Sequence, residues 1–253
     1  MKVAIISDLH SNREALEAVF AHIRAQGIAT LFCLGDVIGY GPEPEFCVDL
    51  VRGHASLCLM GNHDEALFHD ASDFNPHARG AIEFTRARMR PKWFSSSEKK
   101  ARWKWLRELP HTHREGRFLF VHGSPRDPVR EYVLSTDGFL NPDKLRSIFE
   151  AFDGVCLGGH THHPGMHDEE LNFHGLEGRE SLTLALPAGK KFFLNVGSTG
   201  QPRDGDPRAC YAVLEDHQIT WHRVAYDHRA TMQKILDTGV LSDVLARRLA
   251  LGK

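Results

Sequence analysis

Three histidines lie within four residues of one another in the segment CLGGHTHHPG, residues 156–165. They are His160, His162 and His163, and they follow two glycines and precede a proline. Neutral imidazole is the commonest metal ligand in proteins, so the segment could supply part of a metal site. One such cluster predicts little by itself, because the chain has 17 histidines. A metal site requires matching ligands from other parts of the chain.

Polar residues able to bind a metal stand at the end of each of five apolar runs of strand length. The carboxyl ends of strands in an open parallel sheet lie along one edge, where such folds place their sites. We therefore expect these residues to converge on one place. They are Asp8 and His10 after KVAIIS, Asp36 after TLFCLG, Asn62, His63 and Asp64 after ASLCLM, His122 at the end of RFLFVH, and His160 and His162 after GVCLGG.

The residue types in this set indicate the kind of metal. Carboxylates, neutral imidazoles and one amide carbonyl, without a thiolate, suit Mn, Fe, Zn or Ni better than a structural zinc site made of cysteines. Asp8 and Asp36 are both needed if two dications lie close together, because a bridging carboxylate reduces their repulsion. Two metals roughly 3.5–4 Å apart can clamp a phosphoryl group during displacement. Asp8 or Asp36 alone would be better explained as a cap, but the whole set is not a collection of independent caps.

The elements that must position these residues alternate between strand and helix in the first 160 residues. Leu16, Val19, Phe20 and Ile23 have the spacing of a buried helix face. The pair of Ser11 and Glu14 in this segment predicts a capping box at the start of that helix. A second helix is predicted over NPDKLRSIFEAF, with its N-cap at the asparagine and proline in its first turn.

The chain after about residue 171 has a different pattern. The runs SLTLALP, KKFFLNVG, ACYAVLE and QITWHRV predict strands joined by short turns, which favours antiparallel pairing. Two helices are expected at about residues 228–250. We expect one domain over residues 1–253, because a chain of this length can bury one large core.

A helical insertion is expected at about residues 65–116, between two predicted strands. It is rich in Arg and Lys, and the pair of Ser95 and Glu98 predicts a second capping box. Insertions of this length are usually functional when they are structured. Two interpretations stay open: solvated helices packed by Trp103, Trp105 and Leu106, or a lid that faces the substrate.

Composition excludes several classes of protein. The formal net charge is -2, so general nucleic-acid binding is not expected. The five cysteines form no CxxC pair, and three of them lie in apolar runs as buried free thiols do, which favours a reducing compartment. The first residues are too short in their apolar part for a signal peptide, and no stretch suits a membrane span. We therefore expect a cytoplasmic protein that has no membrane partner.

The order of the motifs D-x-H, G-D, G-N-H-D, a histidine before glycine, and G-H-T-H resembles that of the calcineurin-like metallophosphoesterases. The resemblance extends across nearly the whole chain and is closest to prokaryotic phosphodiesterase or phosphatase members. It implies an α/β fold, namely a four-layer αββα sandwich of two mixed β-sheets flanked by helices. It also implies a dinuclear metal centre between the loops of the two sheets.

The resemblance also implies a role for each site residue. His63 is implied to be catalytic: it faces the substrate and protonates the leaving group. The implied reaction is attack on phosphorus by a hydroxide that bridges two divalent or trivalent transition-metal ions, manganese being favoured over iron, zinc or nickel. The implied ligands are Asp8, His10, Asp36 and His162 for one metal, and Asp36, Asn62, His122 and His160 for the other, with Asp36 as the bridge.

One stretch departs from the pattern of members that act on phosphoserine and phosphothreonine. Those members carry G-D-x-V-D-R-G, whereas this chain has GDVIGYG, so Gly39 and Tyr40 occupy the Asp and Arg positions. A phosphodiester has one charge fewer than a monoester and needs less help from arginine, so we expect diesters to be favoured. A phosphomonoesterase or a protein Ser/Thr phosphatase is the alternative. Arginines that could replace the missing one are Arg79, Arg86, Arg88 and Arg90 of the insertion, and Arg203 and Arg208.

Two further classes of protein, a non-catalytic scaffold and a serine hydrolase, have less support in the sequence. Some members of the family keep the fold but serve as non-catalytic scaffolds; the presence of His63 and all seven candidate ligands argues against this. The stretch VHGSPRD could suggest a serine hydrolase with Ser124 as nucleophile, but the G-x-S-x-G elbow is missing. Walker A spacing is also absent, so ATP hydrolysis of that kind has no support.

Overall fold

Two six-stranded mixed β-sheets form the centre of the computed structural model, which describes residues 2–253. The first sheet has the order β3 (Leu57–Cys58), β2 (Thr30–Cys33), β1 (Lys2–Ile6), β11 (Ala209–Glu215), β12 (Gln218–Val224) and β9 (Ser181–Ala185). The second has the order β4 (His113–Glu115), β5 (Phe118–Phe120), β6 (Val155–Gly158), β10 (Phe192–Asn195), β7 (Gly165–His167) and β8 (Phe173–Gly175).

Side chains alternate between the two faces of each strand, so that one strand contributes to two hydrophobic cores. On β1, Val3 and Ile5 lie in the core between the two sheets, while Ala4 and Ile6 face the outer core beneath α1. Both sets of side chains are buried because a strand points successive residues to opposite faces. The second sheet has an outer core of its own, in which Cys156 packs with α7.

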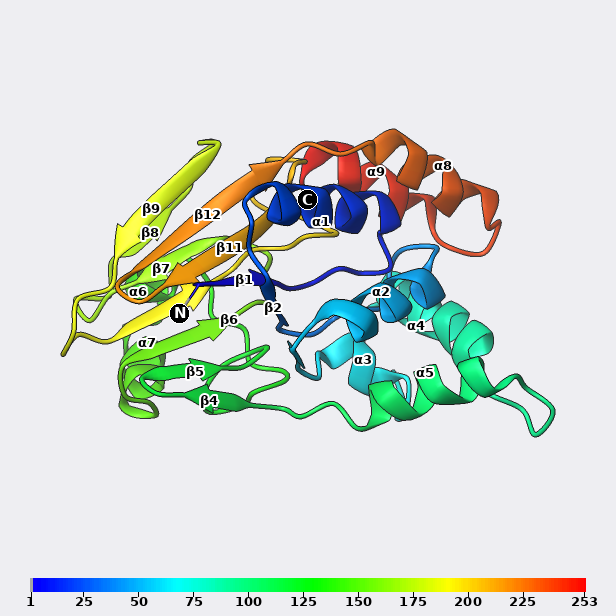
Figure 1. Ribbon diagram of the computed structural model, residues 1–253, viewed down its shortest axis with the longest axis horizontal. Helices are drawn as coiled ribbons and strands as arrows, with labels where there is room; N and C mark the ends of the chain where they lie inside the picture. The colour runs from blue at the N-terminus through cyan, green and yellow to red at the C-terminus, as the bar shows by residue number, and fades with distance from the viewer. Residues whose placement is uncertain (1) are drawn as a thin grey trace.

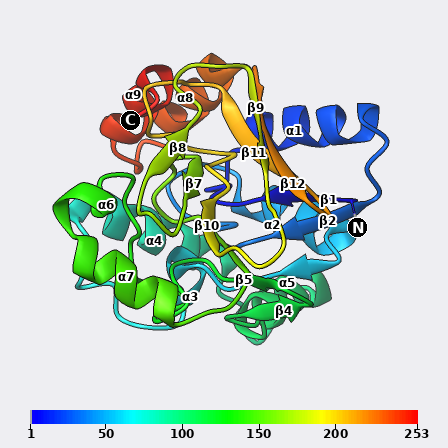
Figure 2. The ribbon, with the colours of Figure 1, turned by 90° about the vertical axis from the view of Figure 1, so that its left-hand side faces the viewer.

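Helices cover both outer faces (Figures 1 and 2). Figure 2 shows α6 and α7 on one side of the sheets and α1 on the other, which confirms the predicted αββα sandwich. The helices α3, α4 and α5 lie together at one end of the molecule, and α8 and α9 lie beside α1 (Figure 1). Their bounds are α1 (Arg13–Ala25), α2 (Pro44–His54), α3 (Asn62–Ala66), α4 (Pro76–Met89), α5 (Ser97–Arg107), α6 (Asp137–Leu140), α7 (Pro142–Glu150), α8 (His228–Asp237) and α9 (Asp243–Leu251).

The two predicted capping boxes are each wrong by one residue. The N-cap of α1 is Asn12, whose side chain accepts the N–H of Ala15. Ser11 instead has a positive φ of 55° and lies in the turn before the helix. The N-cap of α5 is Ser96, because the Ser95 hydroxyl accepts the N–H of Lys92 in the preceding turn.

The pairing of the later strands is also more mixed than predicted. The strands β9, β11 and β12 pair antiparallel with one another, as expected. The strand β10 pairs antiparallel with β7 but parallel with β6, because it returns to the middle of the second sheet. Among the described residues 2–253, no helix combines the length and the apolar character that a membrane span needs.

Candidate metal centre

The structure brings all seven candidate ligands together, from loops of both sheets. Donor atoms of Asp8, His10 and His162 lie within 4.8 Å of one another, and so do those of Asp36, His122 and His160. Asn62 joins the second group, since its Oδ1 lies 3.2 Å from His122 Nε2. The expectation of one sheet edge is wrong in one respect: β1, β2 and β3 belong to the first sheet, whereas β5 and β6 belong to the second. The site lies where the strand ends of the two sheets meet.

Each of the four histidines uses one ring nitrogen to hold a backbone carbonyl. A carbonyl only accepts, so the nitrogen beside it carries the proton and the other nitrogen presents a lone pair to the site. Nδ1 is the donor in three of them, and Nε2 in the fourth. The acceptors are the carbonyls of Ile38 for His10 at 3.3 Å, Leu34 for His122 at 2.9 Å, Gln201 for His162, and Arg130 for His160 at 3.1 Å.

This arrangement leaves acceptor atoms facing each other. The Nε2 atoms of His10 and His162 are 3.1 Å apart, and with both protons on Nδ1 neither can donate to the other. The Nε2 of His122 faces the Oδ1 of Asn62 in the same way, at 3.2 Å. Opposed lone pairs repel unless a cation lies between them. The donor set of nitrogen and oxygen atoms therefore fits borderline transition ions.

Asp36 lies between the two groups. Its Oδ1 accepts the backbone N–H of His63 at 2.8 Å, which fixes the carboxylate. Its Oδ2 is 3.7 Å from His10 Nε2 and 3.5 Å from His122 Nε2, so one oxygen faces both groups. Burial, followed by the nearby Asp8 carboxylate, raises the pKa of Asp36 well above its ordinary value. A pair of bound cations would favour the ionised form of this carboxylate.

The imidazoles are kept neutral, as metal ligation requires. Burial lowers the pKa of His160 to about 3 and that of His162 to about 4. Burial also lowers the pKa of His10 and His122. Burial alone would raise the pKa of Asp8, but His162 and the other imidazoles nearby hold it below its usual range.

Backbone strain is concentrated at the same loops. Nine non-glycine residues in the described part of the chain have positive φ, and five of them are candidate ligands: Asp8, His10, Asp36, His160 and His162. Each such residue costs on the order of 1–3 kcal/mol and persists only where the surroundings fix it. The folded chain therefore carries several kcal/mol of strain at this one place, which is typical of a functional site.

His63 lies beside the candidate ligands, with a ring nitrogen within 4.8 Å of donor atoms of His10 and Asp36, and its ring is held by packing. Its ring centroid is 4.5 Å from that of Tyr40, 4.9 Å from His10 and 5.2 Å from Phe74. Its buried Nδ1 has no hydrogen-bond partner among residues 2–253. Gly39 makes this packing possible, because a Cβ at that position would lie 2.5 Å from Nδ1. Burial first, and then the charge of Arg203, lowers the pKa of His63 well below its ordinary value.

Asp64 fastens two of the strand-end loops to each other. Its carboxylate accepts the backbone N–H groups of Val37, Ile38 and Gly61 at 3.1–3.3 Å. Burial raises its pKa to about 7, and these N–H donors act in the opposite direction. Asp64 is one of the polar residues expected at the strand ends. In the structure it binds these backbone N–H groups and belongs to none of the ligand groups above.

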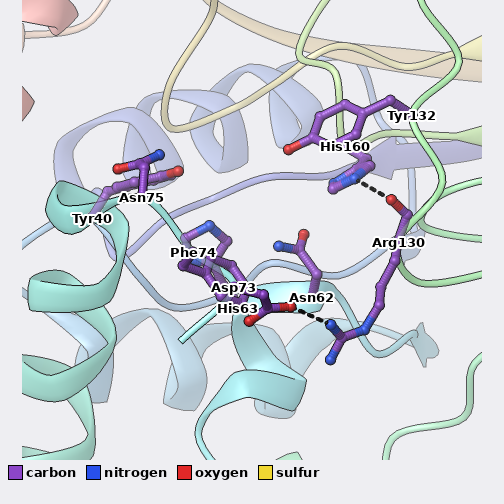
Figure 3. Close-up of a pocket in the computed structure, with 9 residues that line it drawn as sticks. All are labelled: Tyr40, Asn62, His63, Asp73, Phe74, Asn75, Arg130, Tyr132 and His160. Carbon is purple, nitrogen blue, oxygen red and sulfur yellow. Dashed lines mark hydrogen bonds and ion pairs between the residues drawn. The ribbon is translucent and has the colours of Figure 1, made fainter. Parts of the chain in front are cut away.

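A pocket of about 290 Å³ opens beside His63 (Figure 3). Tyr40 and Tyr132 lie at opposite sides of it, with Phe74 and His63 between them. Arg130 forms an ion pair with Asp73 at 2.8 Å, and the Tyr132 ring stacks on His160 with centroids 3.8 Å apart. Sequence reasoning missed most of this lining, because no local motif marks it. The full lining is Tyr40, Asn62, His63, Asp73, Phe74, Asn75, Arg130, Tyr132 and His160.

The insertion contributes to the pocket only through its loop at Asp73–Asn75. Trp103, Trp105 and Leu106 pack in the core beneath α1 and α2. Three of its candidate arginines bind the protein itself. Arg79 donates to the carbonyls of Ala71 and Ser72, Arg86 to those of Ala66, Leu67 and His69, and Arg88 to Glu45 and the carbonyl of Pro42.

Ser124 has a structural environment. Its hydroxyl donates to Glu131 and accepts the backbone N–H groups of Arg126 and Asp127, both at 3.1 Å. These bonds form a tight turn after β5. No histidine among residues 2–253 contacts the hydroxyl by a hydrogen bond, so the serine-hydrolase alternative gains no support.

Comparison with known proteins identifies the same family along most of the chain. A family model described as the calcineurin-like phosphoesterase superfamily domain matches residues 1–218. An uncharacterised protein of Methanocaldococcus jannaschii is 35% identical over 258 residues, covering 99% of this chain and 98% of its own. The crystal structure of a metallophosphoesterase from Sphaerobacter thermophilus is 36% identical, covers both chains completely and superposes with a TM-score of 0.83. A hypothetical protein from Pyrococcus horikoshii shares the fold, with a TM-score of 0.75, 16% identity, and coverage of 100% of this chain and 98% of its own.

Proposed function

Since the chain belongs to the calcineurin-like phosphoesterase superfamily, we propose that it is a metal-dependent hydrolase of phosphate esters that favours phosphodiesters. The observation that carries this proposal is the position of Asp36, whose Oδ2 faces histidines of both ligand groups. A single carboxylate oxygen between two sets of neutral imidazoles suits a dinuclear centre better than a mononuclear one.

The two proposed sites divide the ligands as follows. Asp8, His10, Asp36 and His162 would hold one ion, and Asp36, Asn62, His122 and His160 would hold the other. Two bound ions, with manganese favoured, would neutralise phosphate oxygens and lower the pKa of a water molecule so that it becomes the nucleophile. Iron, zinc or nickel would suit the same donors.

His63 would serve the leaving group. Its ring borders the pocket, its Nδ1 has no hydrogen-bond partner in the described chain, and rings on three sides fix its orientation. A departing alkoxide needs a proton, and a positioned imidazole is the usual donor. The lowered pKa of His63 means that the imidazolium is a minor but strongly acidic form at neutral pH.

The preference for diesters is supported by the lining of the pocket beside His63, which includes Tyr40, Phe74 and Tyr132. The pocket beside His63 offers aromatic walls to an organic substituent, which suits an ester with groups on both sides of phosphorus.

A cytoplasmic setting is part of the proposal. The five cysteines are buried and free, as in proteins that stay in a reducing compartment. Burial raises the pKa of Cys156 well above its ordinary value and that of Cys210 to about 12, so these thiols are unreactive and serve the core.

Kinetics on matched esters test the proposal. Protein supplied with Mn²⁺ should hydrolyse bis(p-nitrophenyl) phosphate with a higher kcat/KM than p-nitrophenyl phosphate, which has the same leaving group and one more charge. Dialysis against a chelator should abolish both activities, and added Mn²⁺ should restore them. A higher kcat/KM for the monoester would make the protein a phosphatase, and absence of activity on every ester with metal bound would refute the proposed function.

A further inference from the structure

The segment after β10 lies against the candidate ligands. The N–H of Gly200 donates to the carbonyl of Asp8 at 2.9 Å, and the carbonyl of Gln201 accepts from His162 Nδ1. The N–H of Arg203 donates to the carbonyl of His162 at 3.5 Å. These contacts fix the main chain of residues 200–203 at the edge of the candidate metal centre. The side chain of Arg203 therefore starts next to a ligand residue.

The guanidinium of Arg203 is held by neutral groups only. It donates from Nη2 and Nε to the Oε1 of Gln201, at 2.8 and 3.3 Å, and from Nη2 to the Tyr40 hydroxyl at 3.4 Å. No carboxylate among residues 2–253 forms an ion pair with it. The neighbouring Arg208, in contrast, forms an ion pair with Asp206 at 2.6 Å. Arg203 thus keeps its positive charge without an ion-pair partner in the described part of the chain.

A second guanidinium lies near the same aromatic ring. The Cζ of Arg203 is 5.7 Å from the centroid of Tyr40, and the Cζ of Arg248, on α9, is 5.6 Å from it. Burial, followed by repulsion from Arg203, lowers the pKa of Arg248. Arg248 donates to the carbonyl of Lys253. Two partly buried cations that repel each other are stabilised when an anion binds near them.

Tyr40 connects the guanidinium of Arg203 to the candidate centre. Its ring centroid is 4.6 Å from that of His10 and 4.5 Å from that of His63. The guanidinium contacts the same ring and its hydroxyl. Arg203 therefore lies one aromatic ring away from a candidate ligand and from His63.

We infer that Arg203 binds a non-bridging oxygen of the substrate's phosphate group, with Arg248 adding positive charge from its own place beside Tyr40. The geometry supplies, from a distant part of the chain, the cation that Tyr40 cannot provide from its own position. A guanidinium suits this role because its planar N–H groups form strong, directed bonds to phosphate. The inference rests on the proposed function, since it assumes that a phosphate group enters the centre.

Binding of inorganic phosphate to the metal-loaded protein tests this without requiring turnover. In calorimetry with Mn²⁺ present, Arg203→Gln should weaken phosphate binding about 10–100-fold, the usual loss for one charge-assisted hydrogen bond. Arg203→Lys should recover part of the affinity, because it restores the charge without the planar geometry. Arg248→Gln should weaken binding less, by about 3–10-fold, since Arg248 is proposed to add charge without a direct bond to the phosphate.

Matched variants separate this role from a general loss of charge. Arg208→Gln removes an arginine of the same segment whose charge is already paired, and Arg247→Gln removes an exposed one beside Arg248 that pairs with Asp243. Both should bind phosphate as the parent protein does. Wild-type affinity in Arg203→Gln would overturn the inference, and so would loss of metal from that variant, which would make Arg203 a support for His162 only.

Kinetics distinguish failure of the inference from failure of the proposed function. In Arg203→Gln, the rise in KM should be about tenfold larger for p-nitrophenyl phosphate than for its diester, because the monoester has the extra charge. Equal effects on the two esters would contradict direct contact with phosphate oxygen. If the parent protein hydrolyses no ester, the proposed function fails, and phosphate binding still decides whether Arg203 holds the anion.

Discussion

The strand-end loops and the insertion at residues 65–116 meet at the pocket beside His63, yet they are held in different ways. In the loops, the candidate ligands are fixed by the backbone: Asp36 accepts an N–H group, and each histidine holds a carbonyl. Five of the seven have positive φ. Positions of this kind tolerate little change, because the surrounding chain determines them completely.

The insertion is held by its side chains instead. Arg79 and Arg86 reach back to carbonyls of its first turns, and Arg102 of α5 pairs with Asp49 of α2 at 2.5 Å. Only the loop at Asp73–Asn75 enters the pocket. Under the proposed function, the loops would carry the chemistry, whereas the insertion would shape the space for the organic part of the substrate. Substitutions in the two regions should therefore differ in both the kind and the size of their effects.

The largest effect is expected at Asp36. Asp36→Asn removes the charge from the oxygen that faces both groups, so the protein should fall from about two bound ions per chain to one or none. Losing metal assistance worth about 5 kcal/mol or more lowers the rate by about 5 × 10³-fold or more. Elemental analysis and ester hydrolysis measure the two quantities together. Asp49→Asn, which weakens the ion pairs of Asp49 with Arg102 and Arg52, is the control and should keep metal and activity. A fully active protein with at most one ion would contradict the dinuclear centre.

Substitution of His63 tests whether the loops have a catalytic role in addition to the proposed metal binding. His63→Ala should keep both ions and lose about 10²–10⁴-fold in rate, the range for one acid–base group. The loss should be smaller for esters with acidic leaving groups, which need less protonation. Loss of an ion from the variant would show that His63 is a ligand. His69→Ala, at an exposed histidine of the insertion, is the matched control.

The pH dependence of the parent protein and of His63→Ala tests whether the protonated form of His63 is the active one. The pKa of His63 lies well below its ordinary value, so its protonated fraction rises about tenfold for each unit by which the pH falls toward that pKa. The advantage of the parent protein over His63→Ala, measured as kcat/KM on an ester with a poor leaving group, should therefore grow from pH 8 to pH 6. It should show no plateau near 6.5. A ratio independent of pH would exclude proton donation by the imidazolium.

The sequence could predict that the candidate ligands gather in one place, because each of them belongs to a short motif at the end of an apolar run. Asp8 and His10 are two residues apart, and so are His160 and His162, so local spacing was sufficient. The two-sheet arrangement followed from the family resemblance and not from the pattern. An apolar run indicates a buried strand, but nothing within it tells which sheet the strand joins. This is why the five runs appeared to belong to one sheet.

The surroundings of the ligands could not be predicted because they depend on long-range contacts. Arg203 acquires its position from the carbonyl of His162, 41 residues earlier in the chain. Phe74 and Tyr132 come from the insertion and from the loop after β5, and neither lies in a recognisable motif. The capping errors at Ser11 and Ser95 have a local cause. Ser11 lies in the preceding turn with a positive φ, and the Ser95 hydroxyl accepts the N–H of Lys92 in the preceding turn. The next residue is therefore the N-cap in both cases.

A third substitution compares the stability of the two regions. Asp64→Asn replaces a carboxylate that accepts three backbone N–H groups with an amide that can accept through only one atom. The variant should lose about 2–4 kcal/mol in free energy of unfolding, because buried N–H groups are left without an acceptor. Urea denaturation of metal-free protein measures it. Asp73→Asn, which weakens an exposed ion pair between the insertion and Arg130, should cost less than about 1 kcal/mol. Equal losses of unfolding free energy would contradict the view that the backbone contacts of the loops contribute more to stability than the side-chain contacts of the insertion.

The smallest effect is expected in the insertion itself, at Phe74. Its ring lies 5.2 Å from that of His63 and forms part of the pocket wall, so it should contact the leaving group rather than the phosphate. An aromatic contact contributes about 0.5–1.5 kcal/mol, so Phe74→Ala should raise KM about 2–10-fold for a diester with a phenyl leaving group. The change should be smaller for a matched alkyl ester, and kcat should stay nearly constant, because His63 and the ligands are untouched. Phe94→Ala removes an aromatic ring of the insertion that is 66% exposed and absent from the pocket lining, and it should leave both parameters unchanged.

A fall in kcat for the alkyl ester in Phe74→Ala would show that the ring positions His63. The insertion would then take part in the chemistry, and the division of labour between the two regions would be wrong.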